Sequence, residues 1–197
     1  VPVKHACQEA GLRGEIAPIL SEIIFGSPNV NLRQHQAEAL VTSIKGYEGK
    51  KNVVVTSGTG SGKTESFLLP VIARLLDERL GQNHLTINRW WEKNWSSERS
   101  WSGVRKTGGR INPAVRAMVL YPTNALVEDQ MSRLRKTAIL SKDINEGKPL
   151  FYFGRYTGTT PGGTESPPAI LDAKWKKRIQ LESEEINDIE NESRSFI

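Results

Sequence analysis

Residues 52–70 read NVVVTSGTGSGKTESFLLP, and this stretch decides the fold that we expect. Three consecutive valines predict a strand that is buried on both faces. A glycine-rich turn follows at once, and Lys63 and Thr64 then open an apolar segment of helical length. A strand, a glycine-rich loop and a helix in that order are the context of a phosphate-binding P-loop. The stretch therefore predicts an α/β fold in which a parallel sheet is flanked by helices.

The loop has the residue types needed to bind ATP and Mg²⁺. Glycine permits backbone conformations that turn successive N–H groups inward around phosphates, and the following helix N-terminus adds more N–H groups. We expect Lys63 to reach the β- and γ-phosphates and the Thr64 hydroxyl to ligate Mg²⁺, so that both residues are catalytic. The alternative is a glycine-rich connector followed by a chance Lys-Thr pair. The expected ATP ligands in the loop are Gly58, Thr59, Gly60, Ser61, Gly62, Lys63 and Thr64.

Gln36 is a further candidate contact for the nucleotide, and we place Arg33 in the same site. A glutamine amide carries both a donor and an acceptor, which matches the N6 and N7 edge of adenine. Gln36 lies on a helix predicted over residues 32–44, whose start is marked by Asn31 and Gln34 as a capping pair. The alternative is a solvent-facing glutamine on an amphipathic helix.

Composition narrows the classes of protein to consider. The chain has 197 residues, of which 37% are apolar and 25% are charged, so it can bury one sizeable core. Apolar runs are too short to cross a membrane, and the N-terminus lacks the apolar core of a signal peptide. Cys7 is the single cysteine, which fits a reducing compartment. We therefore expect a cytoplasmic protein without a membrane partner, and the net charge of +5 allows an anionic partner.

Two segments stand apart from the expected core. Residues 1–30 predict a helical lead-in that is broken by Gly14 and Pro18. Residues 81–116 form a polar insertion with four of the five tryptophans and seven Lys or Arg against two Glu. Tryptophans interleaved with cations suit stacking on bases and contact with phosphates. The insertion can equally be a small subdomain whose tryptophans pack on each other or on the parent fold.

Two more buried strands are expected before the C-terminal segment. Residues 117–121 run directly into a helix N-terminus at residues 122–130. Residues 150–153 form the other strand and end in a stretch with glycine, hydroxyls and Arg155. Open α/β sheets bind ligands along this edge. From Ala169 onward, a charged helical segment is expected.

These motifs, in this order, resemble those of superfamily 2 helicases. Gln36, the loop 57–64, residues 121–126 with Gln130, and residues 155–158 resemble the Q motif, motif I, motif Ia and the strand-end element before motif Ib. That family accepts a small residue such as Ser57 in place of the first P-loop glycine. In detail, the sequences SGTGSGKTESFLLP and YPTNALVEDQ are most similar to a branch of large DEAD/DEAH-type helicases with a C-terminal zinc-binding region. That branch includes repair helicases and helicases of bacterial anti-phage systems such as DISARM and Druantia.

The resemblance implies a RecA-like fold and a nucleic-acid-dependent ATPase that translocates on or unwinds DNA or RNA. ATP would bind between this domain and a second RecA-like domain elsewhere in the helicase chain, and other defence-system subunits are expected partners. Backbone phosphates of a single strand or an unwinding duplex, with DNA favoured, would be held by Thr123, Asn124, Arg155 and Gly158. No DEAD or DEAH sequence follows, so residues 31–197 resemble a first motor domain that ends before that box, and we expect the fragment alone to be inactive.

Two other functions fit parts of the sequence. A nucleotide-gated scaffold would bind ATP as a switch without translocating. A P-loop nucleotide kinase would also have a basic lid, but it does not account for the PTNAL sequence followed by Gln130.

Overall fold

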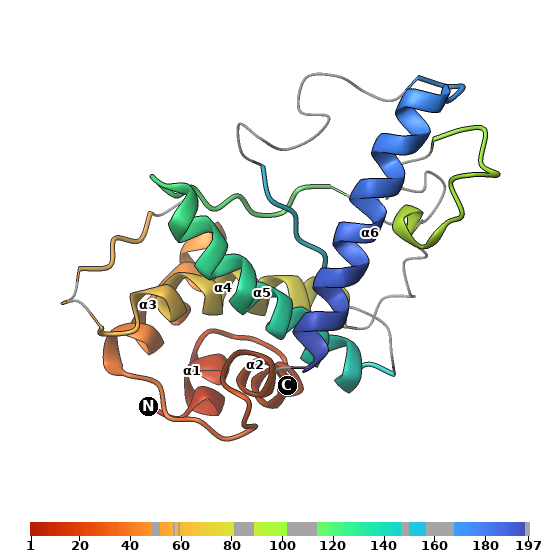
Figure 1. Ribbon diagram of the computed structural model, residues 1–197. Coiled ribbons are helices and arrows are strands. Elements are labelled where there is room, and N and C mark those ends of the chain that lie inside the picture. The colour runs from red at the N-terminus through yellow and green to blue at the C-terminus, as the bar shows by residue number, and fades with distance from the viewer. Residues whose placement is uncertain are drawn as a thin grey trace. The chain divides into compact units, whose positions relative to one another are not determined.

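The structure is a computed structural model (Figure 1) that describes residues 1–48, 52–56, 58, 60–80, 89–101, 114–146, 150–156 and 168–195. The chain divides into two units. One unit comprises Val1–Gln82 and Thr137–Tyr152, and the other comprises Asn83–Lys136 and Phe153–Ile197. Among the described residues, no helix has the length and apolar character needed to cross a membrane.

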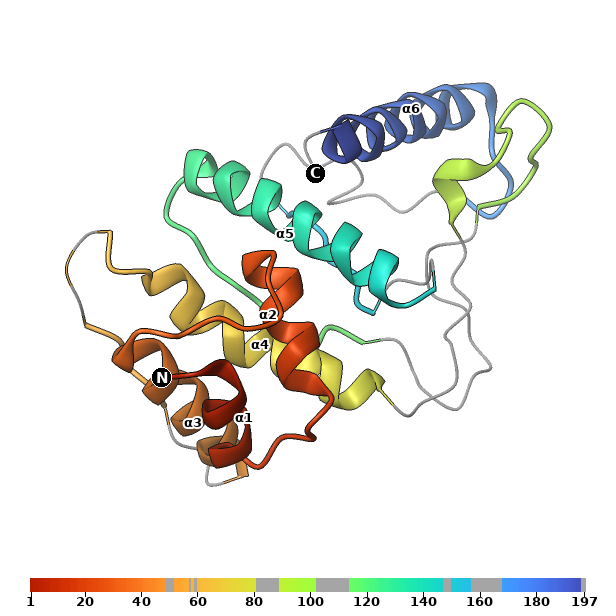
Figure 2. The same cartoon turned by 90° about the horizontal axis from the view of Figure 1, so that it is seen from below.

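The first unit is built around the helix that follows the P-loop. Its helices are α1 (Val3–Glu9), α2 (Ile16–Phe25), α3 (Gln34–Glu48) and α4 (Lys63–Arg79). Helices α2 and α3 both pack against α4, and α1 packs against α2 and α3 (Figure 2). The apolar residues of α4 recur on one side of the helix, as a core-facing helix requires. The fully buried side chains at the centre of this unit include Leu20, Leu40, Leu69, Ile72 and Leu76.

Residues 1–30 contain α1 and α2, and the predicted break at Pro18 is wrong. Pro18 is the third residue of α2, in a first turn whose N–H groups have no partner within the helix. The chain turns instead at Gly11, where φ is +78°, and at Gly26, where φ is +73° and α2 ends. Glycine adopts this left-handed conformation without the penalty that a Cβ brings.

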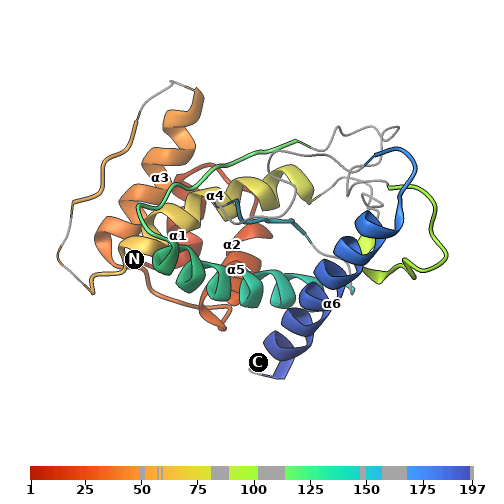
Figure 3. The same cartoon turned by 45° about the horizontal axis from the view of Figure 1, so that its top comes forward.

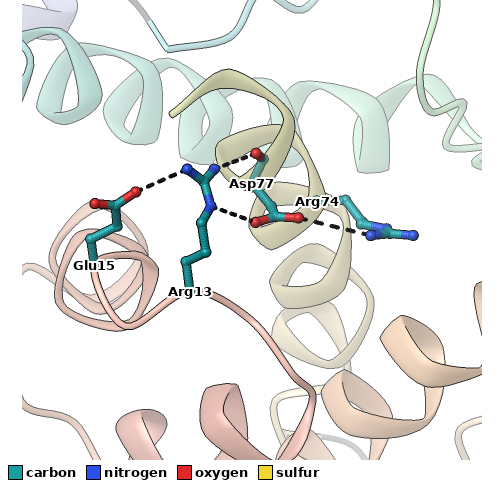
Figure 4. A network of polar contacts seen from close by, with 4 residues as sticks. All are labelled: Arg13, Glu15, Arg74 and Asp77. Atoms are coloured by element: carbon teal, nitrogen blue, oxygen red, sulfur yellow. Dashed lines mark hydrogen bonds and ion pairs between the residues drawn. The ribbon is translucent and has the colours of Figure 1, made fainter. Parts of the chain in front are cut away.

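A polar network joins the segment between α1 and α2 to the last turns of α4 (Figure 4). The Nε of Arg13 lies 3.0 Å from the Oδ1 of Asp77, and a second guanidinium nitrogen donates to the Asp77 carbonyl. Arg13 also pairs with Glu15 at 3.0 Å, and Arg74 lies 3.9 Å from Asp77. A cation at a helix C-terminus is favourable. Because these side chains are 30–56% exposed, solvent screens the pairs, and each contributes about 0–1 kcal/mol.

The second unit has α6 as the longest of its described helices. It contains the short 3-10 helix η1 (Trp90–Glu92), the first part of α5 (Asn124–Ile144), and α6 (Ala173–Ser195). Helix α6 packs against η1 (Figure 3). Just before α6 begins, the N–H of Leu171 donates to the carbonyl of Arg99 at 3.0 Å. This bond fixes the chain that follows η1 at the N-terminal end of α6.

The predicted sheet is not confirmed. Within the described residues, the structure has no β-strand and only an isolated bridge between Pro2 and Asn31. Residues 52–56, 114–121 and 150–156 have no regular secondary structure. Val54, Met118 and Leu120 are each more than three-quarters exposed. The strands over 53–55, 117–121 and 150–153 therefore stay a prediction.

Candidate nucleotide-binding site

The P-loop backbone has left-handed glycines directly before α4. The φ angles are +71° at Gly60 and +80° at Gly62, and Gly62 is the residue that precedes the helix. A Cβ added at Gly62 would lie 2.4 Å from the Nε2 of Gln36, closer than atoms can approach. A side chain at this position would displace the Gln36 amide and would be strained at φ +80°, so the position favours glycine. The contact places the backbone of the loop beside the side chain of Gln36.

Lys63 and Thr64 lie in the first turn of α4, as the sequence predicts. The Lys63 ammonium donates to the Gly58 carbonyl at 2.6 Å and so crosses the loop. Ser66 closes the turn, since its N–H and its hydroxyl both donate to the Gly62 carbonyl at 3.3 Å. A lysine ammonium, left-handed glycines and a helix N-terminus together form a donor set that suits a polyphosphate. Ser61 is half-buried, and Thr59 lies outside the described residues.

Gln36 contacts the P-loop directly. Its Oε1 accepts from the N–H of Arg33 at 2.9 Å, and its Nε2 donates to the Gly62 carbonyl at 3.2 Å. The Arg33 guanidinium donates to the Gly60 carbonyl at 3.2 Å. Gln36 is only 6% exposed, so the interpretation of a solvent-facing glutamine is wrong. The structure brings Arg33 and Gln36 together with Gly60, Gly62 and Lys63.

The start of α3 differs from the predicted one. The helix begins at Gln34 rather than residue 32. The hydrogen bond that closes its first turn is donated by the N–H of Arg33 to the side-chain Oε1 of Gln36, three residues later. This is the side-chain half of a capping box, displaced by two residues from the predicted Asn31 and Gln34 pair. Gln34 bonds forward instead, to the Oε1 of Glu38 at 2.8 Å.

The candidate nucleic-acid residues lie at the start of α5 and near it. Thr123 and Asn124 are exposed, and the Thr123 carbonyl accepts the N–H of Val127 at 3.3 Å in the first turn. Arg155 pairs with Glu128, one turn further along α5. Gly158 lies outside the described residues. The structure thus brings Arg155 to the helix that carries Thr123 and Asn124 at its N-terminus.

The tryptophans of the insertion pack against each other. The ring centroids of Trp90 and Trp101 are 4.9 Å apart, and those of Trp95 and Trp101 are 5.7 Å apart in a stacked arrangement. Trp95 is 2% exposed and forms a small core with Leu171 and Ile179. Its indole N–H donates to the Trp90 carbonyl at 3.0 Å. A buried indole cannot stack on a base, so the structure favours the subdomain interpretation.

Two cations of the insertion are part of this tryptophan core. Arg89 lies 5.2 Å from the centre of the Trp91 ring and 2.8 Å from the Glu92 carboxylate. Lys93 lies over Trp95 and 3.8 Å from Glu98. Cation–π contacts of this kind stabilise the aromatic cluster. The partner helix could not be predicted from the pattern, because Trp175 and Ile179 of α6 lie more than 70 residues after Trp101.

Comparison with known proteins shows which family and which relative this sequence matches. Residues 33–150, more than half of the chain, match the family described as DEAD/DEAH box helicase. The chain is 38% identical over 133 residues to "Druantia protein DruE" of Escherichia coli (strain UMEA 4076-1). That match covers 65% of this chain and 6% of the relative, so the chain spans a small part of that protein. No solved structure gave a significant match.

Proposed function

We propose that this chain, which belongs to the DEAD/DEAH box helicase family, is the ATP-binding part of a nucleic-acid-dependent helicase. Helicase domains of this family have a RecA-like fold and bind ATP, usually with Mg²⁺. The observation that carries the proposal is the contact of Gln36 with Gly62, because it joins the two sequence motifs expected around a nucleotide. A P-loop nucleotide kinase does not account for the family match, which includes residues 121–130.

In this proposal, the P-loop holds the phosphates and α3 holds the base. Lys63 would exchange the Gly58 carbonyl for phosphate oxygens. The Thr64 hydroxyl would be one of the few protein ligands of a Mg²⁺ ion that neutralises phosphate charge. The bound ATP supplies the free energy of hydrolysis for movement. Gln36 and Arg33 hold the loop through Gly62 and Gly60, and Gln36 is the residue that selects adenine. The remaining proposed loop ligands are Gly58, Thr59 and Ser61.

We further propose that the three predicted strands form the RecA-like parallel sheet. The support is that Val54, Met118 and Leu120 are apolar and exposed, as strand residues are before neighbouring strands cover them. Residues 1–30 are then a helical lead-in, and residues 31–197 are part of the first RecA-like domain with the insertion at 81–116. A second RecA-like domain of the helicase chain is its partner in ATP hydrolysis.

Thr123, Asn124, Arg155 and Gly158 are the proposed contacts with the nucleic-acid backbone. Exposed hydroxyl and amide groups at a helix N-terminus, with a cation beside them, suit phosphate and carry no sequence preference. Arg155 would exchange Glu128 for phosphate. We propose DNA as the favoured substrate and other defence-system subunits as partners, and the similarity to Druantia protein DruE supports a role in bacterial anti-phage defence.

The test is ATP hydrolysis by the full-length protein with and without a single strand. We expect the strand to stimulate hydrolysis. The double substitution Thr123→Ala and Asn124→Ala removes two hydrogen bonds to charged phosphates. It should therefore raise the concentration of single strand that gives half-maximal stimulation of hydrolysis by at least about tenfold. Ser132→Ala, an exposed position further along α5, is the matched control and should have no effect. ATP binding without strand-stimulated hydrolysis would favour the nucleotide-gated scaffold.

A further inference from the structure

Helix α6 carries its charges in the order that a helix dipole disfavours. Four of its first six residues are cations, and residues 182–192 have six carboxylates and no cation. Cations destabilise a helix N-terminus, and carboxylates destabilise its C-terminus. Helix stability therefore does not explain this arrangement. The four cations are Lys174, Lys176, Lys177 and Arg178.

Contacts with the tryptophan core hold α6 in place, although the order of its charges is unfavourable for the helix. Trp175 and Ile179 pack on Trp95, and the Nδ2 of Asn187 donates to the Trp91 carbonyl at 3.1 Å. Asp172 caps the first turn, since its Oδ1 accepts the N–H of Trp175 at 2.8 Å. One side of α6 is thereby fixed to the insertion. The position of the helix does not depend on its lysines.

Three lysines at the start of α6 are available for an anionic partner. With 100° between successive residues, Lys177 lies opposite the side that carries Trp175 and Ile179, Lys174 lies at the flank of that side, and both lysines are exposed. Lys176 is partly exposed beside them, and none of the three pairs with a carboxylate of a described residue. Arg178 differs, because it lies over the Trp175 ring and pairs with Glu182 at 3.3 Å.

Arg99 extends the same surface. Its carbonyl accepts the N–H of Leu171, two residues before α6 begins, so the exposed Arg99 lies at the lysine end of the helix. We propose that Arg99, Lys174, Lys176 and Lys177 form a second contact for a nucleic-acid backbone, which we call the α6 basic surface. The proposal rests on the proposed function, and this surface is separate from the contacts at Thr123 and Asn124.

The chemistry of the surface favours nucleic acid over an acidic protein. Protein interfaces are dominated by buried aromatic or apolar anchors, whereas here the indoles are already packed in the core of the unit. Flexible cations without such anchors bind phosphates by releasing counterions, independently of sequence. The carboxylates of the second half of α6 repel a strand, so they confine it to the first half.

The experiment compares two triple variants of the full-length protein with equal net charge. The test variant is Lys174→Gln, Lys176→Gln and Lys177→Gln, and the matched control is Lys4→Gln, Lys45→Gln and Lys136→Gln, which removes three exposed lysines elsewhere. Binding of a fluorescent single strand is measured across a salt titration. Since each phosphate contact contributes about 0.7 to the slope of log K against log salt, we expect the test variant's slope to become shallower by about 2. Its affinity should fall at least about tenfold near 0.1 M salt, while the control keeps the wild-type slope.

Two further readouts separate the possible causes. The melting temperature should not fall in the test variant, because removing cations from a helix N-terminus does not destabilise it. The hydrolysis of ATP without a strand should be unchanged, because these lysines lie outside the nucleotide site. An unchanged salt slope, or equal losses of strand affinity in both triple variants, would overturn the proposal that the α6 basic surface binds nucleic acid. So would loss of binding to polyglutamate with strand affinity retained, which would indicate an acidic protein partner. If wild-type protein showed no strand-stimulated hydrolysis, the proposed function would fail, whatever the slope of the variants.

Discussion

At the scale of single residues, Gln36 determines how the P-loop is held. Its amide joins the start of α3 to the backbone of Gly62, across 26 positions in sequence. The residue type and its distance from Lys63 predicted a place near the nucleotide. The bond to Arg33 could not be predicted, because Asn31 and Gln34 have the same spacing and asparagine is preferred at a helix N-cap, whereas arginine is not. Three-dimensional packing of α3 against α4 decides between the two pairs.

Gly62→Ala should abolish tight ATP binding. The new methyl would meet the Gln36 amide at 2.4 Å in a left-handed backbone, so either the amide loses its bond to Gly62 or the loop shifts, and the backbone is strained in both cases. We expect the Kd for ATP to rise at least about tenfold, which is about 1.4 kcal/mol. Gly14→Ala is the control, since its Cβ would meet nothing within 4 Å. Equal ATP affinity in Gly62→Ala and wild type, measured by calorimetry, would refute the described loop conformation.

Cys7 should make the stability of the first unit fall at alkaline pH. Burial disfavours the thiolate and raises the pKa of the Cys7 thiol from 9.0 to about 11. Between pH 9 and 11 the unfolded chain loses this proton and the folded chain keeps it, so the free energy of unfolding decreases as pH rises. Cys7→Ala should flatten this dependence in urea titrations at pH 8, 9 and 10. An identical slope in wild type and Cys7→Ala would show that the thiol is not responsible.

At the scale of elements, helices followed their local sequence patterns, whereas the predicted strands are not confirmed. The P-loop predicted a helix from Lys63 to about residue 80, and α4 runs from Lys63 to Arg79. Helical hydrogen bonds are local, so periodicity and end signals largely determine them. A parallel strand is formed only by pairing with segments distant in sequence. For the same reason, the basic tryptophan pattern was compatible with two interpretations until Trp175 and Ile179 of α6 were found beside Trp95.

Trp95→Ala should destabilise the tryptophan core and loosen α6. Truncation of a large buried aromatic side chain costs about 3–5 kcal/mol, through lost burial and a residual cavity. We expect a lower free energy of unfolding in urea and a red shift of the remaining tryptophan fluorescence. Tyr156→Ala removes an aromatic ring that is 76% exposed and should cost little. Similar losses for the two variants would contradict the packing of Trp95.

At the scale of the whole molecule, the order of motifs predicted more than any single motif did. The family match covers Gln36, the P-loop and residues 121–130. The division into two units was not predictable, because α5 contributes residues to both of them. The match to DruE covers 6% of that relative, so the chain spans a small part of its length. Tests of the motor function therefore require the full-length protein.

The most direct test of the central claim is ATP hydrolysis by full-length Lys63→Ala protein at saturating strand. Lys63 is the side chain that crosses the P-loop, and removing a preorganised charge from a phosphoryl-transfer site costs at least about a hundredfold in rate. We predict that loss, with strand affinity unchanged within about twofold and with Lys45→Ala equal to wild type. Turnover by Lys63→Ala close to the wild-type rate would contradict the assignment of this loop as the ATP site.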